Sequence, residues 1–253
     1  MAVRLATWNL ERVSPRAWRR APAQQRRIAA VDADVWVFTE TFTTRSPGDE
    51  YRGVFSPAYP QRRPDPDERW TAIWSRWPIT VLDEPAPHRR GTVAARIDSP
   101  TGPLIVYGTV IAYHGERHHD DGREAQGWEV HRTEIDRQGA EWRRLRAENP
   151  GVPIVVAGDL NQGRSGRRSE YGNTAVRQAL TDAFDAAGLR CVTEIDLVAT
   201  GQITQRAHVE HIAVSDSIGV VGPVLAWDRV DDPGYRLSDH PTVAVEIDVS
   251  PPP

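Results

Sequence analysis

The sequence predicts an α/β fold in which two mixed β-sheets pack face to face, with helices outside. Three observations lead to this prediction. Strand-like apolar runs recur along the whole chain, they outnumber the segments with helical periodicity, and several follow one another after short connections that favour antiparallel pairing. Two stacked sheets can bury this many strands, whereas a purely parallel barrel fits the short connections badly.

Eight apolar runs are candidates for strands. They cover residues 3–8, 35–38, 70–74, 92–97, 104–113, 152–157, 208–214 and 243–249. The stretches "WTAIWSRWPIT", "GTVAARID" and "PLIVYGTVIAY" are consecutive and closely spaced, so we expect them to pair as antiparallel neighbours.

Helical patterns lie between some of these runs. The predicted helices cover about residues 23–31, 124–148 and 173–188. In the longest, Trp128, Ile135 and Trp142 recur at seven-residue intervals and Leu145 follows, which indicates one apolar stripe on a solvated helix. In the last, Gly188 is expected to end the helix, because glycine adopts the left-handed conformation without strain.

Composition narrows the class of protein. The 253 residues are 39% hydrophobic, which is enough to bury a large core, and no linker or repeat divides them. We therefore expect one domain over residues 1–253, with 250–253 as a disordered tail. The single Cys191 excludes an intrachain disulfide and a cysteine-rich zinc site.

Charge and hydropathy exclude further classes. The formal net charge of −4 argues against nucleic-acid binding driven by overall charge, although it does not forbid local contact. All 31 basic residues are arginine, which excludes lysine Schiff-base chemistry and a Walker-type phosphate loop. No apolar stretch is long enough for a membrane span and no leader pattern precedes the first strand, so we expect a cytoplasmic protein. Nothing indicates an obligate protein partner.

Polar side chains follow several predicted strands, at the point where each strand ends. In "VVAGDLNQG", Asp159 and Asn161 are two positions apart, so in an extended chain they point the same way. Similar groups close other strands, namely Asn9 and Glu11, Glu40, Tyr113 and His114, Glu210, and Asp239 and His240. One such residue usually caps a turn, but repeated carboxylates at one rim are tolerable only around a cation. The pattern therefore predicts a Mg²⁺ or Mn²⁺ site.

The order of these motifs resembles the endonuclease/exonuclease/phosphatase superfamily, which includes DNase I, exonuclease III-type abasic-site endonucleases, neutral sphingomyelinases and inositol polyphosphate 5-phosphatases. The resemblance extends over nearly the whole chain, through "TWNLE", "DADVWVFTET", "WTAIWSRWPI", "AYHG", "VVAGDLN", "VEHIAVS" and "LSDHPTVAVEI". It implies a DNase I-like four-layer α/β sandwich and metal-dependent hydrolysis of phosphoesters.

The resemblance also implies a set of metal ligands. Glu40 would be the principal carboxylate ligand, and Asn9 would lie beside it. Asp239 would belong to the metal side of the site. Glu11 matches a position that often carries an acidic residue near an alternative position of the metal ion.

Three further residues would act on the phosphate or on the attacking water, and a fourth would orient one of them. By the same resemblance, Asp159 would orient or deprotonate the attacking water, while Asn161 would hold a non-bridging phosphate oxygen and His240 would face the scissile phosphate. These roles meet the needs of in-line displacement, which requires a positioned water and neutralised equatorial oxygens. His240 needs an orienting carboxylate, and Glu210 stands where the family usually has Asp. Unless the backbone compensates, the extra methylene would move that carboxylate by more than about an ångström, a misplacement that can cost about 100-fold in rate. We still expect the two residues to pair.

A second imidazole pair is indicated near the fifth run. The stretch "PDERWTAIWSR" resembles a DNase I segment in which a glutamate supports another histidine, so Glu68 could hold His114. Other relatives use a tyrosine near this strand end, which makes Tyr113 the competing candidate. Neighbours in an extended strand point in opposite directions, so only one of the two faces the site, and we favour His114 slightly.

The loop "QGRSGRRSEYGNT" is a candidate substrate-binding segment. Arg164, Arg167 and Arg168 could hold backbone phosphates, and Tyr171 could stack on a base or sugar. A flexible polar loop without function explains the same composition equally well.

Three functions are compatible with these features. The leading one is a metal-dependent nuclease or phosphodiesterase that acts on nucleic acid or another phosphodiester. The alternative is a phosphatase or phosphodiesterase for small or lipid phosphoesters, with which the negative net charge is compatible. A catalytically silent phosphate-binding module comes last, because only the Glu210 replacement suggests it.

Overall fold

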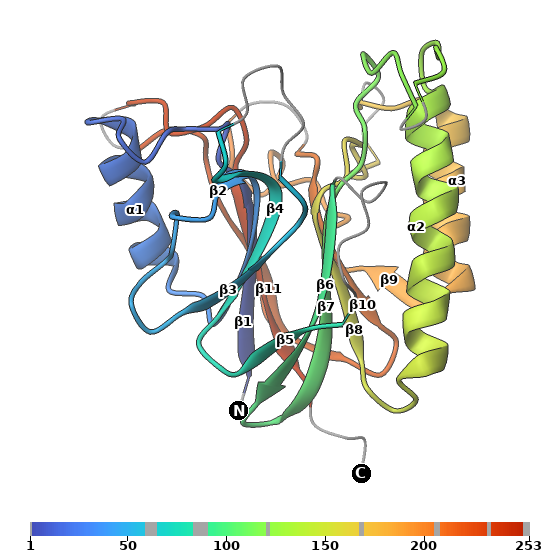
Figure 1. Ribbon diagram of the computed structural model, residues 1–253, viewed down its shortest axis with the longest axis horizontal. Helices are drawn as coiled ribbons and strands as arrows, with labels where there is room; N and C mark the ends of the chain where they lie inside the picture. The colour runs from blue at the N-terminus through green and yellow to red at the C-terminus, as the bar shows by residue number, and fades with distance from the viewer. Residues whose placement is uncertain are drawn as a thin grey trace.

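Two mixed six-stranded sheets pack face to face, and helices cover the outer face of each (Figure 1). This arrangement confirms the predicted four-layer sandwich. The computed structural model describes residues 2–58, 65–82, 91–119, 122–166, 170–204, 208–231 and 234–249. The tail expected at 250–253 lies outside the described residues. None of the described helices is long and apolar enough to cross a membrane.

The first sheet has the strand order β11-β12-β1-β2-β4-β3. Its strands are β1 (Val3–Asn9), β2 (Val35–Phe42), β3 (Arg52–Phe55), β4 (Glu68–Ser75), β11 (Gly219–Trp227) and β12 (Thr242–Asp248). Only β1 and β2 pair in parallel, and helix α1 (Arg20–Val31) crosses between them on the outer face. A crossover of this kind is the usual connection between parallel neighbours.

The second sheet has the order β5-β6-β7-β8-β10-β9. Its strands are β5 (Ile79–Val81), β6 (Thr92–Ser99), β7 (Gly102–Val110), β8 (Ile154–Asp159), β9 (Leu189–Cys191) and β10 (Glu210–Ser215). Its one parallel pair is β7 with β8, and α2 (Glu129–Glu148) connects them. Helix α3 (Thr174–Ala186) packs beside α2 on the same outer face (Figure 1).

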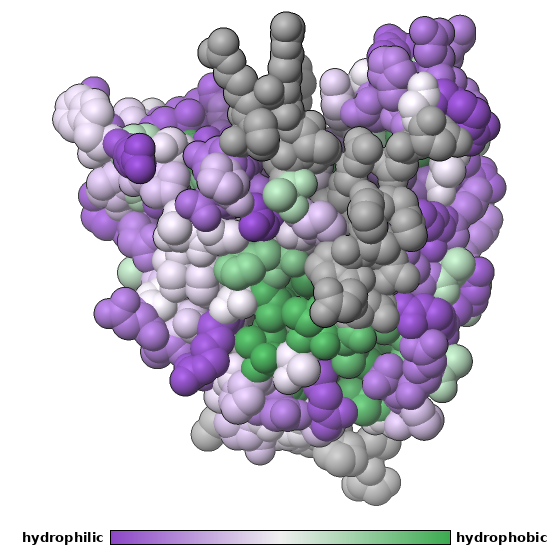
Figure 2. Space-filling model, in the orientation of Figure 1, coloured by the Kyte–Doolittle hydropathy of each residue, from purple (hydrophilic) through white to green (hydrophobic). Residues whose placement is uncertain are grey.

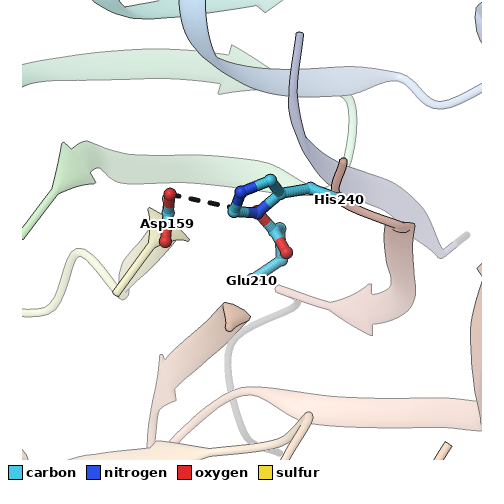
Figure 3. Close-up of side chains that lie close together, drawn as sticks. All are labelled: Asp159, Glu210 and His240. Atoms are coloured by element: carbon cyan, nitrogen blue, oxygen red, sulfur yellow. Dashed lines mark hydrogen bonds and ion pairs between the residues drawn. The ribbon is translucent and has the colours of Figure 1, made fainter. Parts of the chain in front are cut away.

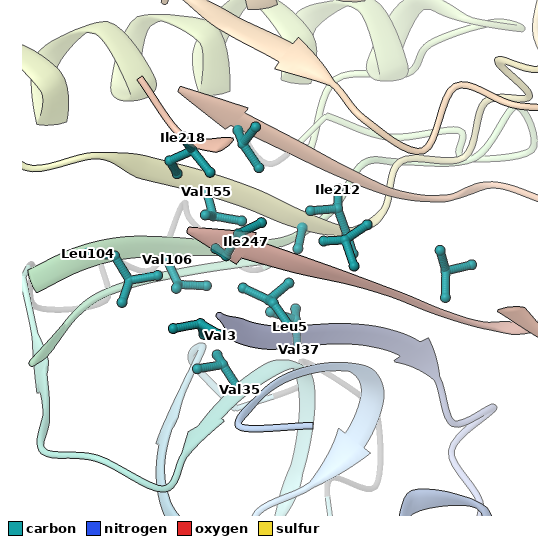
Figure 4. Packing of buried hydrophobic residues seen from close by; sticks show 14 of the residues in the cluster. Val3, Leu5, Val35, Val37, Leu104, Val106, Val155, Ile212, Ile218 and Ile247 are labelled. Carbon is teal, nitrogen blue, oxygen red and sulfur yellow. The ribbon is translucent and has the colours of Figure 1, made fainter. Parts of the chain in front are cut away.

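Aliphatic side chains from both sheets fill the space between them (Figure 4). Val3 and Leu5 of β1 meet Val155 of β8 and Ile212 of β10, all of them almost fully buried. Each such side chain contributes about 1.5–3 kcal/mol when it leaves water. Because side chains alternate along a strand, the next inward positions toward the rim are the polar ends of these strands. The core alternation thus sets the direction of the site residues.

The antiparallel prediction for the three closely spaced stretches is correct for two of them. β6 pairs antiparallel with β7, but β4 lies in the other sheet between β2 and β3. Both edges of β4 are therefore hydrogen-bonded before the chain reaches β6. The chain changes sheets near Pro78, and only the short β5 pairs with β6.

The helices match the predicted segments with shifted ends. α2 begins at Glu129, and Trp128 is its N-terminal flanking residue instead of part of the apolar stripe. Ile135, Trp142 and Leu145 are buried as predicted. Gly188 has φ +60° just after α3, which confirms it as the expected stop.

Several edge strands were not predicted. β3, β5 and β9 are three or four residues long, too short for a period-2 pattern to emerge. β11 contains Gly222 and Pro223, and its register with β12 shifts between Val221 and Leu225. Proline lacks a ladder donor, so such a strand is tolerated at an edge. Hydrophobic side chains gather in the lower front of Figure 2, over β3 and β5 of Figure 1, where Val54 and Ile79 pack against the core.

Candidate active site

Polar side chains from both sheets meet at one rim of the sandwich, above the aliphatic core. A cleft of about 730 Å³ opens there, and Arg12, Glu40, Asp159, Asn161, Asp239 and His240 are among the residues that line it. Asn9 ends β1, Asp159 ends β8, and Glu210 begins the antiparallel neighbour β10. Strand ends from separate parts of the sequence therefore converge, as the motif pattern predicts.

Asp159 reaches this rim because of the glycine before it. Gly158 has φ +145°, and a Cβ at this position would lie 1.9 Å from the Thr109 carbonyl oxygen of neighbouring β7. Only glycine allows this approach of the two backbones. Val155 and Ala157 point between the sheets, so Asp159 continues on the same side.

Glu40 reaches the site against the alternation of its strand. Val37 packs between the sheets and Phe38 packs toward α1, so strict alternation would send Glu40 toward α1 as well. Instead Glu40 has φ +47°, and its Oε1 accepts a hydrogen bond from Asn9 Nδ2 at 3.2 Å. The left-handed backbone redirects the carboxylate into the cleft.

Left-handed backbone is concentrated at this rim. The described non-glycine residues with positive φ are Glu11, Arg12, Asp32, Glu40 and Asn161. All but Asp32, which ends α1, belong to the site or its border. Each conformation costs about 1–3 kcal/mol, so the surrounding contacts must hold them, as is common at functional sites.

Asn9 joins the two carboxylates that face each other across the sheets. Its Nδ2 donates to Glu40 Oε1 at 3.2 Å and to Asp159 Oδ2 at 3.1 Å, and its Oδ1 accepts from the backbone N–H of Glu11. Burial raises the pKa of Asp159 to about 6, against the opposing attraction of His240. Burial also raises the pKa of Glu40, which the Arg12 guanidinium opposes.

His240 lies between two carboxylates (Figure 3). Its Nδ1 is 2.5 Å from Glu210 Oε1 and 4.0 Å from Asp159 Oδ2. Burial alone would lower the pKa of His240, but Glu210 and Asp159 together raise it well above the ordinary value of 6.5. At neutral pH the ring is therefore a cation that donates to Glu210. The Glu210 carboxylate therefore reaches the ring, as the expected pairing requires.

The backbone of His240 is fixed by neighbours that the sequence did not single out. Trp8 Nε1 donates to the His240 carbonyl at 3.0 Å, and the His240 N–H donates to Ser238 Oγ at 3.1 Å. Ser238 Oγ in turn donates to the Asn9 carbonyl at 2.6 Å. These contacts tie the His240 loop to the end of β1.

The donor set fits a divalent cation. Asp159, Glu210 and His240 each offer one ligand atom, and these atoms lie within 4.8 Å of one another. Glu210 Oε2 is buried without a hydrogen-bond partner among the described residues. Since His240 Nδ1 is engaged with Glu210, the cleft carboxylates of Glu40 and Asp239 are further candidate ligands. Carboxylates outnumber cationic side chains in the cleft, so an added cation is electrostatically favoured.

Two predicted acidic groups have arginine partners. Glu11 forms ion pairs with Arg20 and with Arg236, the latter at 2.5 Å. Glu68 lies 3.0 Å from Arg12 Nε. In place of the pair expected between Glu68 and His114, the buried Glu68 carboxylate is neutralised by the nearer guanidinium.

An aromatic group forms one wall of the cleft. Tyr113 and Tyr171 line the cleft, and Tyr171 is 41% exposed. The Trp128 ring lies 5.0 Å from the His114 ring and 5.1 Å from the Tyr171 ring. His114 thus packs on Trp128, while Tyr113 is the one of this adjacent pair that borders the cleft. The slight preference for His114 is not supported by this geometry.

The predicted substrate loop divides into two parts. The substrate-binding role predicted for Arg164 is corrected by its contacts. Its side chain is 4% exposed, forms an ion pair with Glu194 at 3.1 Å and donates to Thr181 Oγ1. Its guanidinium also covers the Phe184 ring of α3. A guanidinium held in this way cannot reach a substrate phosphate. Arg167 and Arg168 lie outside the described residues.

A second polar cluster lies beneath the cleft, on the helix side of the second sheet. Gln162 Nε2 donates to His131 Nε2, and the Gln162 carbonyl accepts from His211 Nε2 at 2.9 Å. Burial lowers the pKa of His131 and of His208 to about 4, and that of His211 well below 6.5. We call His131, His208 and His211 the buried histidines. They are neutral at pH 7 and were not predicted.

Solved structures share this fold at low sequence identity. The endonuclease domain of TRAS1, a telomere-specific non-LTR retrotransposon, has 16% identity and a TM-score of 0.62, over 98% of this chain and 99% of that one. AP endonuclease LMAP from Leishmania major has 12% identity and a TM-score of 0.68, over 100% and 88%. A 3' phosphatase, NExo from Neisseria bound to a product DNA hairpin, has 17% identity and a TM-score of 0.68, over 98% and 100%.

Family assignment rests on the sequence itself. No curated protein matches the chain. The sequence pattern of the endonuclease/exonuclease/phosphatase family matches residues 6–240, which include every strand end that contributes to the cleft. The chain belongs to the endonuclease/exonuclease/phosphatase family.

Proposed function

We propose that this protein is a metal-dependent phosphoester hydrolase, and that it cleaves phosphodiester bonds by in-line attack of water. The arrangement of Asp159 and His240 carries the proposal. A carboxylate with a pKa of about 6 and an imidazolium lie 4.0 Å apart in one cleft. Hydrolysis of a phosphoester needs such a pair, with one group to accept a proton and the other to stabilise negative charge.

Asp159 acts as the base in this scheme. Its Oδ1 accepts from the Asn161 N–H and its Oδ2 from Asn9 Nδ2, which fixes the carboxylate plane. A pKa of about 6 leaves the group mostly ionised at pH 7 and still basic enough to take a proton from water. Neighbouring His240 keeps the charged form accessible despite burial.

His240 and Asn161 hold the phosphoryl group. His240 donates Nδ1–H to Glu210, and its Nε2–H, which lies 3.7 Å from Asp239 Oδ1 and beyond hydrogen-bond distance, can donate to a phosphate oxygen. Asn161 Nδ2 donates to the Ile111 carbonyl, which uses one of its two hydrogens, and the other is available to a non-bridging oxygen. Both side chains line the cleft.

Glu40 and Asp239 would hold the divalent cation, with Asn9 beside them. When bound, Mg²⁺ or Mn²⁺ supplies Lewis-acid stabilisation of the charge that develops on the phosphoryl oxygens. The fixed position of Glu40 costs backbone strain, which the Asn9 and Arg12 contacts offset. We include Glu11 only as a border residue, because two arginines already neutralise it.

A nucleic-acid substrate is favoured by a basic segment, of which Arg12 lines the cleft. Residues 12–31 contain six arginines and no acidic residue, although the whole chain carries a net charge of −4. Within this segment Arg16 and Arg19 are exposed, and Trp18 is 82% exposed. Arginines bind backbone phosphates and an exposed indole stacks on bases, so this segment takes the place predicted for the Arg164 loop.

A phosphatase or phosphodiesterase for small phosphoesters is the second candidate. A smaller pocket of about 300 Å³ shares Asn161, Tyr171, Asp239 and His240 with the cleft. A pocket of this size holds one small organic group and no polymer. The negative net charge is also compatible with a small substrate.

Activity assays separate the two candidates. The protein is incubated with Mg²⁺ or Mn²⁺ and plasmid DNA, single-stranded DNA, RNA, bis-p-nitrophenyl phosphate or inositol phosphates. We expect cleavage of nucleic acid and of the diester, abolished by EDTA. Turnover of inositol phosphates alone would favour the second candidate. Activity that survives EDTA, or Asp159→Ala with full turnover, would overturn the proposed chemistry.

A further inference from the structure

Arg12 has no role in the chemistry proposed above beyond its contact with Glu40, yet it has three partners. Its Nη1 lies 2.7 Å from Glu40 Oε2, and its Nε lies 3.0 Å from Glu68 Oε1. The guanidinium also covers the face of Trp70, 4.6 Å from the ring centre. Arg12 lines the cleft with Glu40 and His240, so this cation is inside the site.

The two carboxylates that pair with Arg12 differ in solvent exposure. The Glu68 side chain is 8% exposed, while that of Glu40 is 20% exposed and borders the open cleft. Glu40 is also the residue that the proposed function assigns to the divalent cation. Its Oε1 is bound by Asn9 and its Oε2 by Arg12, so both oxygens have a partner. A cation that binds Oε2 would compete with the arginine for this oxygen.

We propose that Arg12 is a displaceable counter-ion: it neutralises Glu40 before a cation binds, and cation binding releases it to hold the substrate's phosphoryl group. This inference rests on the proposed function for the identity of the Glu40 ligand. The reaction is an exchange of ion pairs and breaks no covalent bond.

Glu68 and Trp70 keep the released arginine within reach. Glu68 pairs with Nε and the Trp70 ring lies against Cζ, whereas Glu40 takes only the Nη1 end of the guanidinium. When Nη1 leaves Glu40, the group can pivot on these two contacts without leaving the cleft. A guanidinium offers paired donors that match phosphate oxygens, which an ammonium does not.

Charge balance favours this exchange. Without a cation, an unpaired Glu40 would be a partly buried carboxylate beside Asp159, which is costly. With a divalent cation bound to Glu40, the Nη1 end of Arg12 would lose its carboxylate partner, and an anionic phosphoryl group would replace it. Binding of the cation should therefore increase the affinity for phosphate, and Arg12 should account for part of this coupling free energy.

The test measures binding, with inorganic phosphate as a ligand that the enzyme does not turn over. Titration calorimetry gives the affinity of the full chain for Mg²⁺, and then for phosphate with and without saturating Mg²⁺. In Arg12→Gln we expect about tenfold tighter Mg²⁺ binding, because a competing charge a few ångströms away is removed. We expect phosphate affinity to change less than about twofold without Mg²⁺ and to fall about tenfold with it.

Two further variants control for charge and for folding. Arg144→Gln removes a partly exposed arginine on α2 that forms an ion pair with the exposed Glu148. It should leave unchanged the affinity for Mg²⁺ and the affinity for phosphate with and without Mg²⁺. This control separates a nonspecific effect of net charge from the loss of Arg12. Arg12→Lys keeps the positive charge without the planar fork, so it should bind Mg²⁺ like the wild type but lose phosphate affinity in the presence of Mg²⁺.

Two outcomes would overturn the inference. One is an equal loss of phosphate affinity in Arg12→Gln with and without Mg²⁺, which would mean that Arg12 faces phosphate at all times. The other is unchanged or weaker Mg²⁺ binding in that variant. Either result can occur in a protein that hydrolyses phosphodiesters. Conversely, the predicted coupling in a protein inactive on every substrate would support the exchange and contradict the proposed function.

Discussion

Glu210 and His211 are neighbours on β10, yet they belong to polar clusters of opposite character. Glu210 lines the smaller pocket beside the cleft and holds His240 as a cation, while His211 faces the helices and stays neutral. The difference lies in the partners. Carboxylates surround His240, whereas His211 contacts a carbonyl, the Thr193 hydroxyl and His208.

The two clusters therefore respond to pH with opposite sign. The pKa of His240 is raised on folding, so its contribution to stability is full below 6.5 and is lost as pH rises through its folded value. The buried histidines have lowered pKa values, so their contribution is full above 6.5 and is lost as pH falls toward about 4. Strand β10 thus contributes to a charged cluster on one face of its sheet and to a neutral cluster on the other.

Removing the base should produce the largest effect. Asp159→Asn keeps the shape of the side chain but cannot accept the water proton, so we expect turnover to fall about 10²–10⁴-fold. The folded pKa of Asp159 is raised, so the ionised group costs stability above about pH 6. The variant should unfold at the same or higher urea concentration at pH 8, measured by circular dichroism. A large loss of stability would show that Asp159 acts mainly as a structural residue.

Removing the partner of the cationic imidazole should come next. In Glu210→Gln, His240 loses the larger of the two attractions that raise its pKa. We expect kcat to fall about 10–100-fold and the alkaline limb of the pH–rate profile to move to lower pH. The acidic limb, which reports Asp159 near pH 6, should stay within about one pH unit. An alkaline limb at the same pH would contradict the role of Glu210 in catalysis.

The neutral cluster should be visible in stability rather than in rate. Each buried histidine makes the free energy of unfolding fall by up to about 1.4 kcal/mol per pH unit below 6.5. For His131→Gln we expect a shallower decline between pH 7 and 5, smaller than the wild-type decline by about 2 kcal/mol. Urea denaturation at both pH values measures this. An unchanged slope would mean that His131 is protonated in the folded protein.

Arg164 should show the smallest effect, and only on folding. Arg164→Gln loses the ion pair with Glu194 and the contact with Phe184, which we expect to cost about 1 kcal/mol because Glu194 is partly solvated. Its kcat/KM for a diester substrate should stay within about twofold of the wild type. A rise in KM without loss of stability would restore the substrate-binding role predicted from its loop.

The fold and the convergence of strand ends followed from simple patterns. Period-2 alternation places Asn9 and Asp159 on the inward side of their strands, and the motif order identified the family. The position of Glu40 did not follow, because it depends on a left-handed residue within a strand. The partners of Glu68 and Arg164 were missed because a long arginine side chain can pair with several acidic groups. Only the folded chain determines which of these groups is near.

The charge states of the two clusters can be measured directly by NMR titration of the histidine ring nitrogens. We predict that His240 titrates with a pKa well above 6.5 in the wild type and at a lower value in Glu210→Gln, while His211 stays neutral until the protein unfolds in acid. A wild-type His240 that titrates at or below 6.5 would contradict the account.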